Sequence, residues 1–320
     1  AFPERGDSGS PLLIDNQGRL EIAGVFSFFS TGGTQDFNNY STPDGSFGSV
    51  GTFIATQSFL STILSPGRQS RHLSLNMAQQ VLGRDGLVED LRVAIRREEA
   101  DLVILVSGSA DSRFNGEYFR GEASLITGLT LRGSDDNETF VMDGDLQGLP
   151  VEVIGGGGKD TLQDAETRPV DRTWTLSGSN QGQLSDRHLT FREVESLRGG
   201  TANDRFLFLP AGRMTEEIDG GSGLNTLDYS RFDRAIVVHL GTATAPGIGG
   251  SFSGIQAIKG TNQADTLVGP DQDATWTITG VNRGIFDGQI AFDSIENLNG
   301  GTGTDHFRMG TAARLNGSIL

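Results

Sequence analysis

From residue 131 onward, a short glycine-rich turn recurs along the chain. Six segments start with glycine, carry a polar residue at their sixth position and have an apolar residue two positions later. They begin at Gly133, Gly155, Gly199, Gly220, Gly260 and Gly300. The starts are 22, 44, 21, 40 and 40 residues apart, all near multiples of 21. A period of about 21 residues fits one coil of a stack, because each coil has an apolar face that only its neighbours bury.

A longer duplication overlies these turns. Trp-Thr-Leu-Ser-Gly at residues 174–178 recurs as Trp-Thr-Ile-Thr-Gly at 276–280, and residues 191–197 recur at 292–298. The pattern predicts an all-β chain with a parallel β-solenoid over residues 131–320, in which glycine supplies a positive φ angle at each corner. Residues one period apart should be neighbours, Phe140 with Leu162 and Phe206 with Leu227. A β-sandwich would have similar strands but no reason to keep the turns in phase.

These turns resemble degenerate copies of the haemolysin-type (RTX-like) repeat of large secreted bacterial proteins, Gly-Gly-x-Gly-x-Asp-x-Leu. In that family, carboxylates and turn carbonyls bind calcium, so the resemblance implies calcium ligands at Asp160, Asp204, Asp265 and Asp305. The family's turns recur about every nine residues, whereas these are 21 to 44 residues apart, and one sixth position is Asn225. The alternative is that each turn is a structural corner without an ion.

Residues 6–12, at the start of the chain, read Gly-Asp-Ser-Gly-Ser-Pro-Leu. This run resembles the nucleophile loop of the trypsin/chymotrypsin-like serine endopeptidases. The resemblance implies Ser8 as the nucleophile and the N–H groups of Gly6 and Ser8 as the oxyanion hole. In this family the general-base His and its Asp partner precede the serine, so we expect both upstream of Ala1 and no activity from this chain alone. The alternative is a Gly/Ser turn between two strands.

The following residues extend the resemblance to about residue 65. Residues 12–14 and 20–26 are expected to form a hairpin around the Asp-Asn-Gln-Gly turn at 15–18. The resemblance places Phe2 at the floor of the specificity pocket and Ser27, Phe28 and Phe29 beside the substrate. Phe2 implies a small or apolar substrate side chain, because a buried basic one would need a carboxylate partner.

The sequence thus divides into four regions. Residues 1–65 are the C-terminal part of an incomplete trypsin-like β-barrel, 66–86 a polar linker, 87–130 a β-hairpin region and 131–320 the repeats. Two apolar stretches at 91–96 and 101–106 favour a hairpin, although residues 87–100 also fit a helix.

Charge and hydropathy narrow the function. The net charge of −16, with scattered arginines, argues against nucleic-acid binding, which needs clustered Lys and Arg. No apolar run approaches the ~20 residues that span a membrane. We expect part of a secreted or cell-surface bacterial serine endopeptidase that acts on a protein or peptide substrate. Its repeats would meet cell-surface or matrix components, with no required cofactor and calcium as the candidate ion. The alternative is a surface adhesin or structural β-solenoid protein with a non-catalytic protease remnant.

Overall fold

The computed structural model describes residues 11–16, 19–25, 71–77, 90–108, 115–165, 169–184 and 188–320. These residues are nearly all β, as the sequence predicts, and they contain no α-helix. A short 3-10 helix spans Ala123–Leu125. In these ranges we find no helix that is long and apolar enough to cross a membrane.

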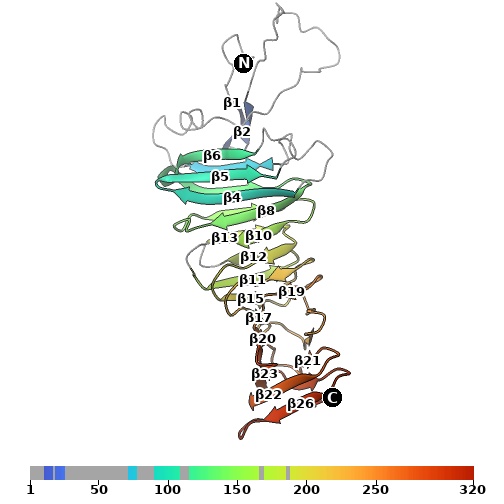
Figure 1. Cartoon of the computed structure of the whole chain (residues 1–320). Helices are drawn as coiled ribbons and strands as arrows, with labels where there is room; N and C mark the ends of the chain where they lie inside the picture. Colours follow the sequence, from blue (N-terminus) through green and yellow to red (C-terminus); the bar gives the residue numbers. More distant parts are fainter. Residues whose placement is uncertain are drawn as a thin grey trace, which may run out of the picture.

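Most described strands belong to two long sheets, whose strands lie one above the next along a common axis (Figure 1). The 8-stranded sheet has the order β19 (Phe252–Ser253), β16 (Ile218–Asp219), β14 (Ser196–Arg198), β10 (Thr161–Asp164), β8 (Asn137–Asp143), β4 (Asp90–Glu98), β5 (Asp101–Ser107), β6 (Gly116–Glu122). The 13-stranded sheet has the order β26 (Asp305–Met309), β22 (Ala274–Gly280), β23 (Arg283–Phe286), β24 (Ile290–Asp293), β20 (Ala257–Lys259), β17 (Thr226–Asp228), β15 (Asp204–Phe208), β11 (Arg172–Gly178), β12 (Gln181–Leu184), β13 (Leu189–Arg192), β9 (Val151–Ile154), β7 (Ile126–Arg132), β3 (Arg71–Asn76). A 3-stranded sheet has the order β18 (Val237–His239), β21 (Thr266–Val268), β25 (Asn297–Asn299).

Neighbouring strands are mostly parallel, and their registers confirm the predicted contacts between coils. Leu162 of β10 pairs with Phe140 of β8, and Phe206 of β15 pairs with Leu227 of β17. In both cases the paired residues are the apolar residues that follow two successive glycine-rich turns. Residues one short period apart therefore lie side by side in adjacent strands, where they share one buried face.

The glycine-rich turns carry the chain from one sheet to another. Those that begin at Gly133, Gly155 and Gly260 leave strands of the 13-stranded sheet, whereas those at Gly199, Gly220 and Gly300 lead into it. The spacings of 44 and 40 residues therefore separate turns on opposite sides of the stack. The sequence period suggested one column of turns, and this was wrong because a turn of the same chemistry closes both sides.

Two inserted hairpins explain why some coils are longer than the short period. β11 and β13 both pair with β12 in antiparallel fashion, and β22 and β24 pair in the same way with β23. The hairpins belong to the duplicated segments, and Trp174 faces Leu184 in the first as Trp276 faces Phe286 in the second. In-register partners across the first insertion, Leu162 and Leu197, are 35 residues apart instead of 22.

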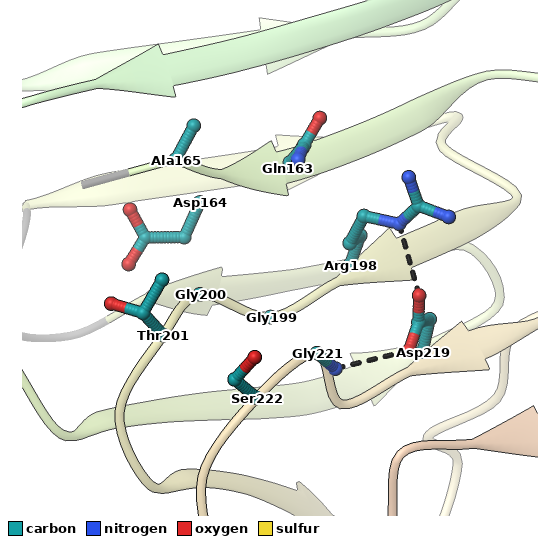
Figure 2. Close-up of a pocket in the computed structure, with 10 residues that line it drawn as sticks. All are labelled: Gln163, Asp164, Ala165, Arg198, Gly199, Gly200, Thr201, Asp219, Gly221 and Ser222. Atoms are coloured by element: carbon teal, nitrogen blue, oxygen red, sulfur yellow. Dashed lines mark hydrogen bonds and ion pairs between the residues drawn. The ribbon is translucent and has the colours of Figure 1, made fainter. Parts of the chain in front are cut away.

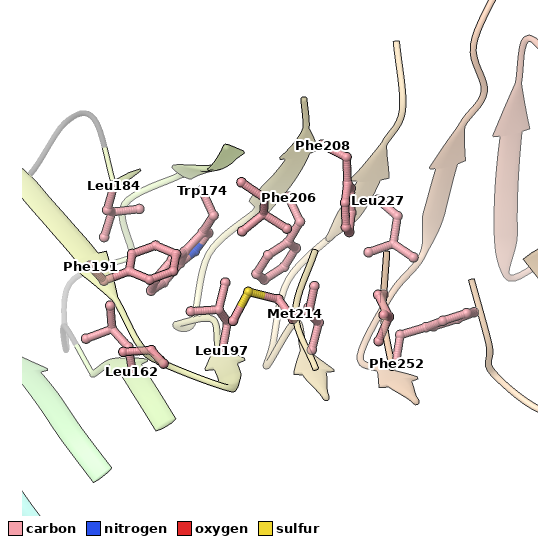
Figure 3. Packing of buried hydrophobic residues seen from close by; sticks show 14 of the residues in the cluster. Leu162, Trp174, Leu184, Phe191, Leu197, Phe206, Phe208, Met214, Leu227 and Phe252 are labelled. Carbon is pink, nitrogen blue, oxygen red and sulfur yellow. The ribbon is translucent and has the colours of Figure 1, made fainter. Parts of the chain in front are cut away.

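The core lies between the long sheets. Buried apolar side chains form a continuous cluster that extends from Met77 to Leu298. Figure 3 shows Leu162 and Leu197 from the 8-stranded sheet packing toward Trp174 and Phe206 from the 13-stranded sheet. These four side chains are at most 1% exposed. Because every coil contributes to the same cluster, the coils support one another as the repeat predicts.

The two apolar stretches after residue 87 form a hairpin, which confirms the favoured alternative. β4 and β5 pair in antiparallel register around Glu99 and Ala100. β4 also pairs in parallel with β8, so the hairpin joins the stack. Arg71–Asn76, expected within a linker, forms β3 beside β7. Leu73 and Leu75 alternate there with polar residues and pack on the core, which is the pattern of a half-buried strand.

The hairpin predicted after the nucleophile loop is also present. β1 (Pro11–Asn16) and β2 (Arg19–Val25) pair in antiparallel register, with Asn16 opposite Arg19. Residues 17–18, in the turn between them, lie outside the described residues.

Candidate functional site

The residues predicted from the protease resemblance all lie outside the described residues. They are the nucleophile Ser8, the oxyanion-hole residue Gly6 and the substrate-binding residues Phe2, Ser27, Phe28 and Phe29. Their expected roles stay predictions. The acidic turn residues, in contrast, can be followed individually.

The sixth residue of each glycine-rich turn points into the protein. Five of these side chains are at most 2% exposed, namely those of Glu138, Asp160, Asp204, Asn225 and Asp265; Asp305, in the last turn, is half-buried. In three of the turns the carboxylate accepts the backbone N–H of the residue after the first glycine. These donors are Ser134 to Glu138 (3.0 Å), Gly200 to Asp204 (2.9 Å) and Thr261 to Asp265 (2.5 Å). The carboxylate thus closes its own turn.

The same positions also join adjacent coils. The backbone N–H of Glu138 donates to Asp160 Oδ1 (2.7 Å), and that of Asp204 donates to Asn225 Oδ1 (2.8 Å). The N–H of Ile236 donates to Asp265 Oδ1 (2.8 Å). A side-chain acceptor of one coil therefore receives an N–H group of the coil before it.

Three further acceptors, which the sequence prediction missed, continue this pattern. Glu195, Gln256 and Glu296 accept the backbone N–H groups of Asp160, Asn225 and Asp265 at 2.9, 2.8 and 2.9 Å. Each acceptor stands four residues before the first glycine of the next turn and follows a buried Val or Ile. Glu195 and Glu296 also occupy equivalent places in the long duplication, so that signal could have revealed them. We call these three residues and the five buried sixth-position residues the side-chain ladder.

The first glycine of each turn is required for space and not for a positive φ angle, which corrects our expectation. None of the six has a positive φ. A Cβ atom added at any of them would lie within 3 Å of the terminal atoms of the turn's own sixth side chain. At Gly199, for example, the added Cβ would lie 2.6 Å from Asp204 Oδ2. The glycine and the ladder residue five positions later therefore form one unit.

Burial changes the protonation of the ladder. It raises the pKa of Asp204 from 3.8 to about 6, although the N–H groups of Gly200 and Trp174 act in the opposite direction. Burial also raises the pKa values of Glu138 and Asp160, whose side chains are hydrogen-bonded to each other across two coils. The nearby negative charges of Asp136 and Glu195 raise them further. These groups therefore hold protons at higher pH than exposed carboxyls do.

The acids implied as calcium ligands are not brought together. Asp160 precedes β10, Asp265 precedes β21, and Asp204 and Asp305 begin β15 and β26, so each belongs to a different coil. In the part of the chain that the structure describes, no group of three or more His, Asp or Glu side chains is arranged to hold a metal ion. The oxygen atoms of Asp204 and Asp265 receive N–H groups instead, which is a poor fit to a cation.

The two copies of the duplication differ at their tryptophans. Trp174 Nε1 donates to Asp204 Oδ1 at 3.1 Å, whereas Trp276 Nε1 and Asp305 Oδ1 have no partner among the described residues. Beside the first pair lies a buried ion pair, Arg172 Nε to Asp164 Oδ2 at 3.0 Å, with side chains 6% and 2% exposed. In the second copy the equivalent residues are Ala274 and Gly269.

A polar recess with a volume of about 430 Å³ crosses the ends of β10, β14 and β16 (Figure 2). It is lined by Gln163, Asp164, Ala165, Arg198, Gly199, Gly200, Thr201, Asp219, Gly221 and Ser222. Burial alone would raise the pKa of Asp219, but the N–H of Gly221 (3.0 Å), the Ser253 hydroxyl and Arg198 (3.0 Å) together lower it. The recess offers hydroxyl, amide and ion-pair groups, but none of the lining residues is a histidine that could activate Thr201 or Ser222 as a nucleophile.

Comparison of the chain with protein-family models, with curated proteins and with solved structures gave no match.

Proposed function

We propose that this chain is part of a secreted serine endopeptidase, in which residues 1–65 belong to the protease domain and the remaining strands form a β-solenoid with RTX-like repeats. Ser8 attacks the scissile carbonyl of a protein or peptide substrate, and the N–H groups of Gly6 and Ser8 stabilise the oxyanion. The observation that carries the proposal is the Gly-Asp-Ser-Gly-Ser-Pro-Leu loop, followed at once by the expected β1–β2 hairpin.

The solenoid's part in this proposal is to hold the protease domain away from its attachment point. The continuous core and the parallel pairing of successive coils support an elongated element of fixed length. Such an element serves as an extension or anchor at the cell surface or in its matrix. Repeat proteins of this kind also present extended polar surfaces to partners.

The test uses the protein encoded by the whole reading frame that contains these residues. A fluorophosphonate probe reacts with a serine only when a neighbouring base activates it. We expect the probe to label this protein, with labelling lost in Ser8→Ala and retained in the matched control Ser10→Ala. Upstream of Ala1, the reading frame should encode a His followed by an Asp. Absent labelling, or labelling that Ser8→Ala leaves unchanged, contradicts the proposal.

A second candidate is a surface adhesin or structural repeat protein with a non-catalytic protease remnant. The recess between β10, β14 and β16 favours it, because its hydroxyl and amide groups suit a polar partner rather than chemistry. A reading frame without the upstream His and Asp would favour this candidate.

A further inference from the structure

The side-chain ladder occupies the positions that would have to bind calcium if the turns worked as in the family they resemble. Calcium takes six to eight oxygen ligands. The carboxylate oxygens of Asp265 instead accept the N–H groups of Ile236 (2.8 Å) and Thr261 (2.5 Å) and the Thr261 hydroxyl (3.0 Å). An N–H group directs its positive end at its acceptor, so this surrounding favours the carboxylate itself and repels a cation.

Asp204 has the same arrangement in another coil and on the other side of the stack. Its oxygens accept the N–H of Gly200 (2.9 Å) and the indole N–H of Trp174 (3.1 Å). The two sites share no residue and lie in different sheets, yet both replace metal coordination with donated hydrogen bonds.

Asn225 shows how the ladder works without a carboxylate. Its Oδ1 accepts the N–H of Asp204 at 2.8 Å, as the acids do for other coils. Its Nδ2 donates to the carbonyl oxygens of Gly254 (2.8 Å), Ser222 (3.2 Å) and Gly221 (3.4 Å). Here the amide NH₂ satisfies converging carbonyls, the groups that bind calcium in the related turns. The residue type at each sixth position therefore matches the local hydrogen-bond polarity.

We propose that hydrogen bonds made by the side-chain ladder replace calcium in closing the turns and joining the coils. The protein then folds and keeps its stability without the ion, and acids and amide are not interchangeable between positions. At Asp265 a carboxylate is needed to receive the surrounding donors. At Asn225 an amide is needed to satisfy carbonyls.

The test is thermal unfolding of the chain 1–320 with calcium chloride and with a chelator. We expect the same Tm in both for the unmodified chain. Asp265→Asn should lower Tm by several degrees in both buffers, because an amide N–H would face the N–H of Thr261 or Ile236. Asp233→Asn is the matched control, since this side chain is 58% exposed, and it should leave Tm unchanged.

Asn225→Asp gives the reverse test. A carboxylate oxygen would replace the NH₂ group that the three carbonyls surround, so Tm in chelator should fall by several degrees. The proposal is overturned if the chelator lowers the Tm of the unmodified chain by several degrees and Asp265→Asn abolishes that difference. It is also overturned if Asn225→Asp unfolds in chelator at the same or a higher temperature. The first of these measurements needs no variant.

Discussion

Replacing Phe206 by alanine tests whether the coils stabilise one another from both sides. Phe206 is 0% exposed, pairs with Trp174 of β11 and Leu227 of β17, and stacks on the Trp174 ring at a centroid distance of 6.0 Å. Loss of a buried phenylalanine ring costs about 3–5 kcal/mol, of which ring stacking accounts for about 1 kcal/mol. We expect Phe206→Ala to lower the free energy of unfolding by this amount.

Phe307→Ala is the matched control. Phe307 occupies the equivalent place in the second copy and stacks on Trp276 at 5.7 Å, but its strand β26 pairs only with β22 and its side chain is half-buried. Its replacement should cost about half as much, because only one side of the ring loses buried contacts. Urea unfolding of chain 1–320, followed by far-UV circular dichroism, measures both variants. An equal or smaller cost for Phe206→Ala would refute the argument that each coil depends on two neighbours.

Two further outcomes follow from the buried charges. Arg172→Ala removes the cation that faces buried Asp164 and should lower the free energy of unfolding by about 3–5 kcal/mol, whereas Arg172→Ala combined with Asp164→Gly, which reproduces Ala274 and Gly269 of the second copy, should cost less; urea midpoints compare them, and a double variant as unstable as the single one would contradict this. The folded-state pKa of Asp204, raised from 3.8 to about 6, means that the folded chain keeps a proton that the unfolded chain has released, so the stability from this proton is present below pH 4 and is lost as pH rises through 6, by about 3 kcal/mol. The urea midpoint should therefore fall between pH 4 and pH 7, and less steeply in Asp204→Asn; an equal slope in that variant would contradict the assignment.

The repeat made the stacking predictable, whereas the path of the chain between coils was not. The apolar residue after each turn identifies the strand that pairs with the next coil, and this holds for Phe140 with Leu162. The side on which a turn lies leaves no mark in its sequence, because turns that enter and leave the 13-stranded sheet use the same glycine and acid. The long spacings were therefore assigned to two coils when each belongs to opposite sides of the stack.

The acidic residues were found by sequence, but their partners were not. A carboxylate that binds calcium and one that accepts N–H groups occupy the same position in the repeat, and only the donors around Asp204 and Asp265 distinguish them. Glu195 and Glu296 were overlooked because they precede the turns instead of lying within them. Their shared place in the duplication carried the information.

The alternation of short and long coils has a mechanical consequence. If the stack is pulled apart from one end, each coil that detaches releases the chain up to its in-register neighbour. The neighbours Phe206 and Leu227 are 21 residues apart, and Leu227 and Ile258 are 31 residues apart. An extended chain spans about 3.4 Å per residue, so the two kinds of coil release about 70 Å and about 105 Å. A pulled molecule should therefore lengthen in steps of two sizes, and their order should retrace the inserted hairpins along the sequence.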